Sequence, residues 1–330
     1  MIRVLSSEGV IHFREHDQTT APIRPDSYIP GAIAYDADLP GGQYFYQTYV
    51  HKHYTIFKST LMPARDTTLR VEYPAPFLGF RIMVENNLRY RLNEKQYYLM
   101  QGQVNFIVAP NVESELYLSK GQVYQVFDLQ IDAQLLQRLS NNDEINQLLN
   151  KVGDSQTWSL QDGPGFASAR ALDCMTDLVD NPGNETYAID LIEQVIEART
   201  MKRQHRQVTE RQVESLFRVR ALIKEQIVLK QHLRDWARIA GMNITYFKEM
   251  FKAVFGITPY HYLLYERIRE AKRVMKFYPH LTLSEVATAC GFSNYNNMRR
   301  AFVVMETMTL SKWQRLSDIT GIVMLLELFQ

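Results

Sequence analysis

Two segments decide the fold: Leu233-x-x-Trp236-Ala237-x-x-x-Gly241-Met242 and, fifty residues later, Leu283-x-x-Val286-Ala287-x-x-x-Gly291-Phe292. Each reads as a short helix with a small alanine, followed by a glycine at which the chain can turn sharply. A second amphipathic helix follows in each copy, with apolar residues one turn apart (Phe247 and Phe251, then Met298 and Phe302). Each copy therefore predicts a helix-turn-helix. Two such motifs joined by a helix are suited to placing recognition helices in successive major grooves of DNA.

The residues around these motifs predict an all-α domain. Its expected helical segments are Val213–Gln226, a first motif over Leu229–Phe255, a connecting helix that ends at Phe277, and a second motif over Leu281–Val304. Thr258 is the expected N-cap of the connecting helix, and Pro259 suits its first turn. We expect this domain to span 213–318, with a charged linker at 201–212 and an apolar tail at 319–330.

Charge divides the chain in the same way. Residues 199–320 hold 22 Lys and Arg against 10 Asp and Glu, a balance of +12, while the rest holds 15 against 26, a balance of −11. Neutralisation of phosphates supplies much of the affinity of proteins for DNA. A solvated basic helical face would explain the charge but not the repeat. A chain of 330 residues also favours two domains over one.

The acidic half predicts a β domain with added helices over 1–200. Residues from about 30 to 130 are rich in Tyr, Phe, Val and Ile in short runs separated by glycines, which is typical of a sandwich or small barrel. Two amphipathic helices are expected over 166–179 and 186–199. They carry an apolar stripe that is either domain core or a dimer interface: Leu178, Val179, Ile189, Ile192, Val195 and Ile196. The predicted fold class is α+β.

Other features argue against several classes of protein. Cys174 and Cys290 are the only cysteines, so no disulfide framework or cysteine-rich zinc site is expected. We find no apolar signal core and no apolar run long enough to span a bilayer. Nucleophile elbows and glycine-rich phosphate loops are also missing. These observations predict a cytoplasmic protein that is not an enzyme and holds no cofactor or metal.

The C-terminal hundred residues resemble the AraC/XylS family of regulators. The matching positions are Leu233, Ala237, Gly241-Met242, Phe247-Lys248, Phe251-Lys252, Gly256-Ile257-Thr258-Pro259, Tyr262-Leu263, Arg267-Ile268, Ala271, Leu283, Glu285-Val286-Ala287, Gly291-Phe292, Arg300 and Phe302. The resemblance implies a seven-helix DNA-binding domain fused to a cupin-like β-barrel that binds an effector or dimerises. It also implies double-stranded DNA, RNA polymerase and a second copy of the chain as partners. The stretch from Thr209 to Leu264 resembles the subgroup that senses ferric siderophores.

The chain departs from the family pattern after the second recognition helix. The family continues there with basic residues and then with Gly and Thr/Ser-Pro, whereas this chain has Val303-Val304, then Thr307 and Thr309-Leu310. Fewer cations mean fewer phosphate contacts, so the first motif is expected to dominate the affinity for DNA.

Residues that face away from the apolar side of each recognition helix are the candidates for DNA contact. Asn243 is the expected N-cap of the first recognition helix, where free backbone amides can hold a phosphate. In the second, an asparagine can pair with adenine and an arginine with guanine. The predicted DNA-binding residues are Asn243, Thr245, Lys248, Glu249, Lys252, Tyr295, Asn296, Arg299 and Arg300.

The candidates for effector binding lie in the β domain. Tyr44 and Tyr46 belong to an aromatic run that could line a pocket or fill the barrel core. His51 and His53 would lie on one side of a strand, as in metal-binding cupins, but no Glu follows at the position of the third ligand. We therefore expect a small-molecule effector, with a ferric siderophore as one candidate, and no metal. Two alternatives are a ligand-independent DNA-binding protein whose β domain only dimerises, and a metal-dependent enzyme built on these histidines.

Overall fold

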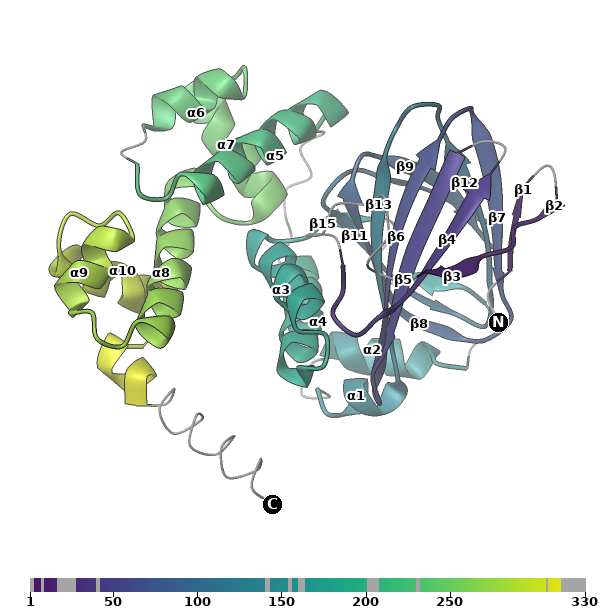
Figure 1. Ribbon diagram of the computed structural model, residues 1–330, viewed down its shortest axis with the longest axis horizontal. Coiled ribbons are helices and arrows are strands. Elements are labelled where there is room, and N and C mark those ends of the chain that lie inside the picture. Colours follow the sequence, from purple (N-terminus) through teal and green to yellow (C-terminus); the bar gives the residue numbers. More distant parts are fainter. Residues whose placement is uncertain are drawn as a thin grey trace. The chain divides into compact units, whose positions relative to one another are not determined.

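The computed structural model describes residues 3–6, 9–16, 28–39, 42–139, 143–153, 156–159, 164–200, 208–229, 232–306 and 308–315. The chain divides into two compact units, 1–213 with 253–256, and 214–252 with 257–330 (Figure 1). Most of the predicted linker and the whole predicted tail lie outside the described residues. Each unit is described by itself below.

The β unit consists of two antiparallel sheets. The first has the strand order β10 (Lys95–Leu99), β9 (Leu88–Leu92), β12 (Val112–Leu118), β7 (Thr67–Tyr73), β1 (Arg3–Ser6) and β2 (Gly9–Val10). The second has the order β14 (Trp158–Ser159), β11 (Gln103–Ala109), β8 (Phe77–Glu85), β13 (Tyr124–Ile131), β6 (Tyr54–Pro63), β5 (Gly42–Val50), β4 (Ile33–Leu39) and β3 (Arg14–His16), and β15 (Gly165–Phe166) also pairs with β11. The predicted barrel or sandwich thus forms, with strands on both sides of the expected 30–130 range.

The core of the β unit lies between the two sheets. Leu69 and Tyr90 come from the first sheet, and Met83 and Ile107 come from the second, yet all four belong to one cluster of buried side chains. Because side chains alternate along a strand, every second residue of these strands points into the space between the sheets. This alternation decides which residues can line an interior cavity.

In the described part of this unit there are also four helices: α1 (Ala133–Gln137), α2 (Asp143–Lys151), α3 (Ala169–Asp180) and α4 (Glu185–Thr200). The helix predicted from residue 166 begins later. Its first amides are capped by Ser168, whose Oγ accepts from the Ala171 amide at 3.0 Å, and Phe166 pairs with Gln103 of β11. In the apolar stripe of α3 and α4, Leu178, Val179, Ile192, Val195 and Ile196 are buried within the chain and Ile189 is half-buried, so most of the stripe is core.

The helical unit is built from α5 (Glu210–Glu225), α6 (Leu233–Ile239), α7 (Ile244–Phe255), α8 (Pro259–Phe277), α9 (Leu283–Ala289) and α10 (Tyr295–Glu306), and residues 310–315 are also helical. The predicted start of α8 is confirmed: Pro259 lies in its first turn, and the Thr258 hydroxyl accepts from the His261 amide at 3.4 Å. Both expected helix-turn-helix motifs are present, as α6 with α7 and α9 with α10.

The connecting helix α8 packs against both motifs. Tyr262 near its beginning contacts Phe251 of α7, with ring centroids 5.9 Å apart. Ile268 and Ala271 further along belong to one buried cluster with residues of α9 and α10. Within the described residues, no helix is both long enough and apolar enough to cross a membrane.

Candidate nucleic-acid interface and interior cavity

The two helix-turn-helix motifs have the same turn geometry. Gly241 and Gly291 adopt φ angles of 67° and 79°, in the left-handed region that favours glycine. In both turns the amide after the glycine donates to the carbonyl of the buried alanine at 2.9 Å (Met242 to Ala237, Phe292 to Ala287). This backbone pattern is typical of a helix that ends at a glycine, and it confirms the repeat found in the sequence.

Both recognition helices begin at an asparagine. The Tyr246 amide donates to Oδ1 of Asn243 at 2.9 Å, and the Asn297 amide donates to Oδ1 of Asn294 at 2.9 Å. The cap at Asn243 is confirmed, whereas Asn294 was not among the predicted residues. It lies one residue further from its glycine than Asn243 does, so the second recognition helix is offset from the first by 51 positions rather than 50. The apolar pairs Phe247 with Met298 and Phe251 with Phe302 have the same offset of 51 positions, which is the sequence signal that identifies Asn294.

The recognition helices bury one face and expose the other. Phe247, Phe251, Met298 and Phe302 are completely buried. Of the nine predicted DNA-binding residues, eight are exposed and Tyr295 is half-buried: the exposed ones are Asn243, Thr245, Lys248, Glu249, Lys252, Asn296, Arg299 and Arg300. The predicted set therefore lies on the outer side of α7 and α10.

When α7 and α10 are aligned with an offset of 51 residues, their outer faces differ in charge. Lys248 corresponds to Arg299, but Lys252 corresponds to Val303, which is 44% exposed. The next residue, Val304, is 62% exposed. The last turn of α10 thus presents apolar surface where α7 presents a cation.

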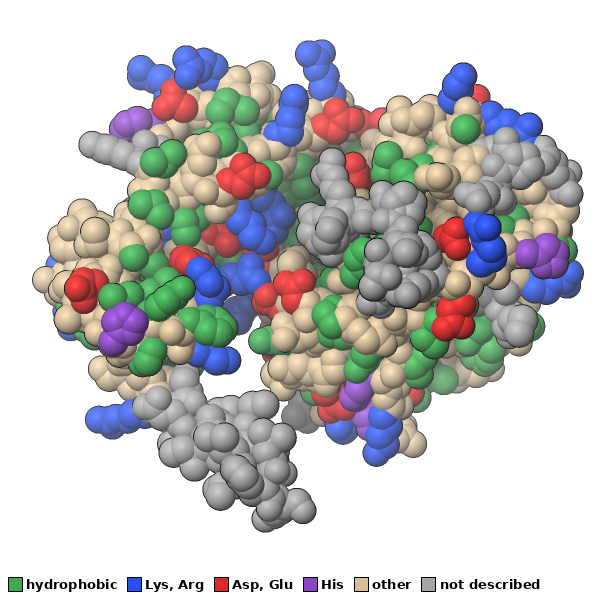
Figure 2. Space-filling model, in the orientation of Figure 1, with side chains coloured by type: hydrophobic (Ala, Val, Ile, Leu, Met, Phe, Trp, Pro, Cys, Tyr) green, Lys and Arg blue, Asp and Glu red, His purple; other side chains and the backbone are tan. Residues whose placement is uncertain are grey.

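Further cations lie on the first helix of the first motif. Arg234 and Arg238 of α6 are exposed, and the Arg238 guanidinium is within 3.1 Å of the Asp235 carboxylate. Figure 2 shows lysine and arginine side chains standing out from the surface of the helical unit. The sequence signal for these two arginines was only the overall basic charge, because the apolar pattern that marks a recognition helix does not single them out.

The turn of the second motif is docked against the chain that follows α5. A Cβ atom on Gly291 would lie 2.6 Å from the Ile227 carbonyl oxygen and 2.8 Å from Cα of Val228. Arg267 of α8 holds the same segment, because its Nε donates to the Ile227 carbonyl at 2.7 Å. Burial lowers the pKa of this guanidinium. Around Gly241, by contrast, a Cβ atom would meet nothing within 4 Å.

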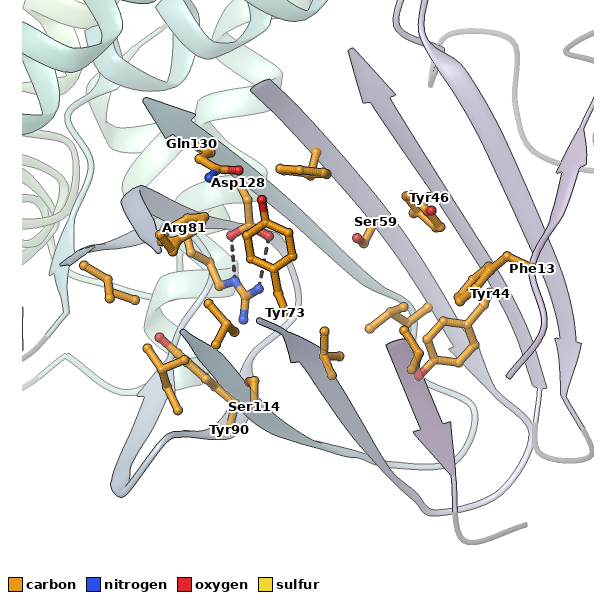
Figure 3. Close-up of a pocket in the computed structure, with 18 residues that line it drawn as sticks. Phe13, Tyr44, Tyr46, Ser59, Tyr73, Arg81, Tyr90, Ser114, Asp128 and Gln130 are labelled. Carbon is orange, nitrogen blue, oxygen red and sulfur yellow. Dashed lines mark hydrogen bonds and ion pairs between the residues drawn. The ribbon is translucent and has the colours of Figure 1, made fainter. Parts of the chain in front are cut away.

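The β unit contains a cavity of about 160 Å³ between its two sheets (Figure 3). Several strands contribute two lining residues that are two positions apart, because every second side chain of a strand points to the same face of the sheet. Such pairs are Tyr44 and Tyr46 on β5, Val71 and Tyr73 on β7, and Asp128 and Gln130 on β13. The lining is mostly apolar and aromatic, which is typical of small-molecule sites.

One ion pair lies in this cavity. Arg81 of β8 donates through Nε to Oδ1 of Asp128 at 2.8 Å and through Nη2 to Oδ2 at 3.0 Å. Residues 81 and 128 are direct partners of the antiparallel strands β8 and β13, so the sheet register holds the pair in its bidentate geometry. The guanidinium also lies 5.2 Å from the centroid of the Tyr90 ring. Despite the cost of burial, Asp128 raises the pKa of Arg81, so this group stays charged.

The hydroxyl groups around the cavity differ in their partners. Tyr90 accepts from Nδ2 of Asn105 at 3.1 Å, and burial raises its pKa to about 12. Tyr44 and Ser114 are only 6% and 2% exposed, and their hydroxyl oxygens have no hydrogen-bond partner in the structure. Buried hydroxyls are usually paired, so these two oxygens are exceptions among the buried polar groups of the β unit.

The predicted effector residues fall into two groups. Tyr44 and Tyr46 line the cavity. His51 and His53 do not: contrary to the expected strand, they lie at the turn between β5 and β6, because the chain reverses direction there. Nδ1 of His53 is 2.8 Å from the Asp132 carboxylate. Within the described residues, no group of three or more His, Cys, Asp or Glu could hold a metal ion.

Comparison with known proteins identifies the helical unit. A family model described as a helix-turn-helix domain matches residues 236–316. Over 92 residues the chain is 29% identical to the "Probable transcriptional regulator LumQ" of Photobacterium leiognathi, which covers 28% of this chain and 37% of LumQ. The chain thus matches well under half the length of that relative. Residues 236–316 thus match a helix-turn-helix domain, and this part of the chain is similar to a transcriptional regulator.

Two solved structures are also similar. The DNA-binding domain of AdpA in complex with a target DNA is 22% identical, with a TM-score of 0.30, over 32% of this chain and 95% of that one. The AraC-like transcriptional activator CuxR is 12% identical, with a TM-score of 0.30, over 85% of this chain and 89% of that one. Both TM-scores are low, and the function proposed below does not depend on them.

Proposed function

We propose that this chain is a sequence-specific DNA-binding transcription regulator of the AraC type, whose β unit senses a small molecule and thereby controls promoter binding. The observation that carries the proposal is the repeated helix-turn-helix with two outward polar faces, on α7 and α10. These faces belong to the basic part of the chain, which carries a balance of +12 over 199–320. No step of this function is catalytic.

The residues of the two faces have different proposed roles. Lys248 and Lys252 bring cations to the first recognition helix and neutralise phosphates, which adds affinity for every DNA sequence. Arg299, the counterpart of Lys248, and Arg300 bring cations to the second, where an arginine can read guanine and Asn296 can read adenine. The counterpart of Lys252 in the second motif is the uncharged Val303, so the first motif contributes more of the total affinity for DNA.

The cavity between the sheets favours effector sensing over a β unit that only dimerises. A bound molecule can change DNA affinity only if it binds the active arrangement of the protein better than the inactive one. A largely apolar cavity with buried hydroxyls that lack partners offers the contacts for such binding. A ferric siderophore is a bulky chelate that wraps an iron ion, and one bound here would extend beyond the cavity of about 160 Å³.

The remaining parts of the proposal concern where and with what the chain works. It would act in the cytoplasm as a homodimer on repeated half-sites, and RNA polymerase would be its partner at the promoter. Dimerisation follows the general rule that two-fold pairs of one chain read repeated DNA sites.

Selection from genomic DNA tests the proposal directly. The purified full-length chain is mixed with sheared genomic fragments at physiological salt, and the retained fragments are sequenced. Recovery of one repeated site supports a sequence-specific regulator. Uniform recovery with a steep dependence on salt would replace the proposal with a non-specific basic DNA binder. A variant with Asn296, Arg299 and Arg300 all changed to alanine is the matched control and should lose the enrichment.

A further inference from the structure

The charges that line the interior cavity cancel. Among the described residues that line it, Arg81 and Asp128 are the only Lys, Arg, His, Asp or Glu, and they are already paired through two hydrogen bonds. Asp128 is 9% exposed, and the remaining walls are mainly aromatic and aliphatic. A charged ligand would therefore add an uncompensated charge to an apolar space, which is costly, whereas a neutral ligand would not.

Polar groups without partners lie at two places in this cavity. Figure 3 shows Ser114 close to Arg81 and Tyr90, while Tyr44 lies apart from them beside Phe13. Tyr44 belongs to β5 and Arg81 to β8, and the strands β6 and β13 separate them in the sheet. A ligand with hydrogen-bonding atoms at both of its ends could reach both hydroxyls once the Ser114 and Tyr44 side chains turn toward it, because their oxygens are closed off from the cavity in this structure.

The cavity volume sets the size of that ligand. A cavity of about 150 Å³ accommodates benzene, and the cavity in the β unit measures about 160 Å³. Rings supplied by Tyr46 and Phe13, whose centroids are 5.0 Å apart and nearly perpendicular, offer the edges and faces against which another ring packs well.

We propose that this cavity binds an uncharged molecule about the size of one substituted aromatic ring, with a hydrogen-bonding group at each end. One end bonds to Ser114 and to the free donors of the Arg81 guanidinium, and the other end bonds to Tyr44. The inference rests on the proposed function, since it names the class of molecule that the β unit senses. A carboxylate of the same size is rejected because it would leave a net negative charge in the cavity.

Three probes of nearly equal shape and different charge test this inference. Binding of 4-hydroxybenzamide (neutral), 4-hydroxybenzoate (anionic) and 4-hydroxybenzamidine (cationic) to the full-length chain is measured by titration calorimetry at neutral pH. We expect the amide to bind at least tenfold more tightly than either ion. Equal or tighter binding of the benzoate, or no binding of any probe, would overturn the inference.

A variant that changes the charge of the cavity gives a second, more discriminating test. Asp128→Asn keeps the size of the side chain but gives the lining a net charge of +1, so the benzoate should become the preferred probe. The matched control is Asp36→Asn, which removes the surface pair between Asp36 and Arg14 at 2.9 Å and should keep the original order. An unchanged order in a folded Asp128→Asn chain would overturn the inference; should that variant not fold, the ranking on the unaltered chain decides.

The two proposals fail in different ways. DNA selection without any probe tests the regulator, whereas calorimetry tests the cavity. Specific DNA retention together with preference for the anionic probe would overturn only the neutral-ligand inference. Loss of specific DNA retention would overturn the proposed regulator function. The preference of the cavity for an uncharged ligand would still be tested separately by calorimetry.

Discussion

The two turn glycines offer a matched pair of substitutions, Gly291→Ala and Gly241→Ala. Both residues have left-handed φ angles and occupy the same place in their motifs. Their surroundings differ: a Cβ at position 241 meets nothing within 4 Å, whereas a Cβ at position 291 overlaps backbone atoms of Ile227 and Val228. The pair therefore separates the cost of backbone conformation from the cost of packing.

The expected losses follow from these two costs. The left-handed conformation alone costs a residue with a Cβ roughly 1 to 2 kcal/mol, which is the full expected loss for Gly241→Ala. At Gly291 the Ile227 oxygen at 2.6 Å must also move, and overpacking of this kind costs a further 1 to 3 kcal/mol or so. Gly291→Ala should thus lower the free energy of unfolding by about 2 to 5 kcal/mol, and the shift should weaken the contact between Arg267 and Ile227.

Urea unfolding of the full-length chain, followed by tryptophan fluorescence, measures the difference. Trp236 lies in the first motif, and the Trp313 ring is 5.8 Å from Phe302 of the second motif. The third tryptophan, Trp158, lies in β14 of the β unit, so both variants are made in a Trp158→Phe background in which the helical unit reports its own unfolding. Both variants keep the same tryptophans and can be compared directly. Equal losses in the two variants would refute the reasoning, because they would mean that the contact around Gly291 adds nothing to stability.

Three further predictions concern DNA contact, buried hydroxyls and pH. Lys252→Ala should weaken binding to all DNA sequences and reduce, by about one, the slope of the logarithm of the binding constant against the logarithm of the salt concentration. Arg300→Ala should instead relax selection at one base pair. Equal, sequence-independent losses in binding titrations would contradict these roles. Tyr44→Phe removes a buried hydroxyl without a partner and should leave the free energy of unfolding unchanged or higher. Tyr90→Phe removes the acceptor of the buried Nδ2 group of Asn105 and should lower the free energy of unfolding by about 1 to 3 kcal/mol in chemical denaturation; the opposite order would exclude our account of the cavity. Burial and a neighbouring phenol raise the pKa of Tyr46 from 10.0 to about 12, so its contribution to stability is complete below about pH 10 and is lost as the pH rises through about 12; an unfolding midpoint that stays constant over this range would contradict the expected loss.

Local signals in the sequence predicted the helical unit well. A threonine before Pro259 marked the start of α8, and its predicted end at Phe277 is the end observed. The alanine and glycine of each motif predicted a close helix contact and a left-handed turn, and both are present. Such signals succeed because caps, turns and apolar periodicity depend on residues only a few positions apart.

The cavity could not be predicted in the same way. Arg81 and Asp128 are 47 positions apart, and they meet only because β8 and β13 are neighbours in this register. No local pattern reports strand order, so the aromatic run supplied Tyr44 and Tyr46 but not Ser114 on the facing sheet. The N-cap Asn294 was missed for another reason: one extra position separates it from its turn glycine, so the spacing of the glycines alone does not locate it.

Under the proposed function, the connecting helix α8 sets the spacing between the two DNA segments that α7 and α10 contact. Its residues Tyr262 and Ile268 pack into the cores of the first and second motif respectively, so one rigid rod sets the separation of α7 and α10. A double helix advances about 34 to 36 Å in 10 to 10.5 base pairs. One inserted base pair would therefore move one half-site along the DNA axis and rotate it around that axis. A recognition helix held at a fixed separation by α8 could then no longer contact it. Operators of this protein should tolerate changes of base more readily than changes of spacing.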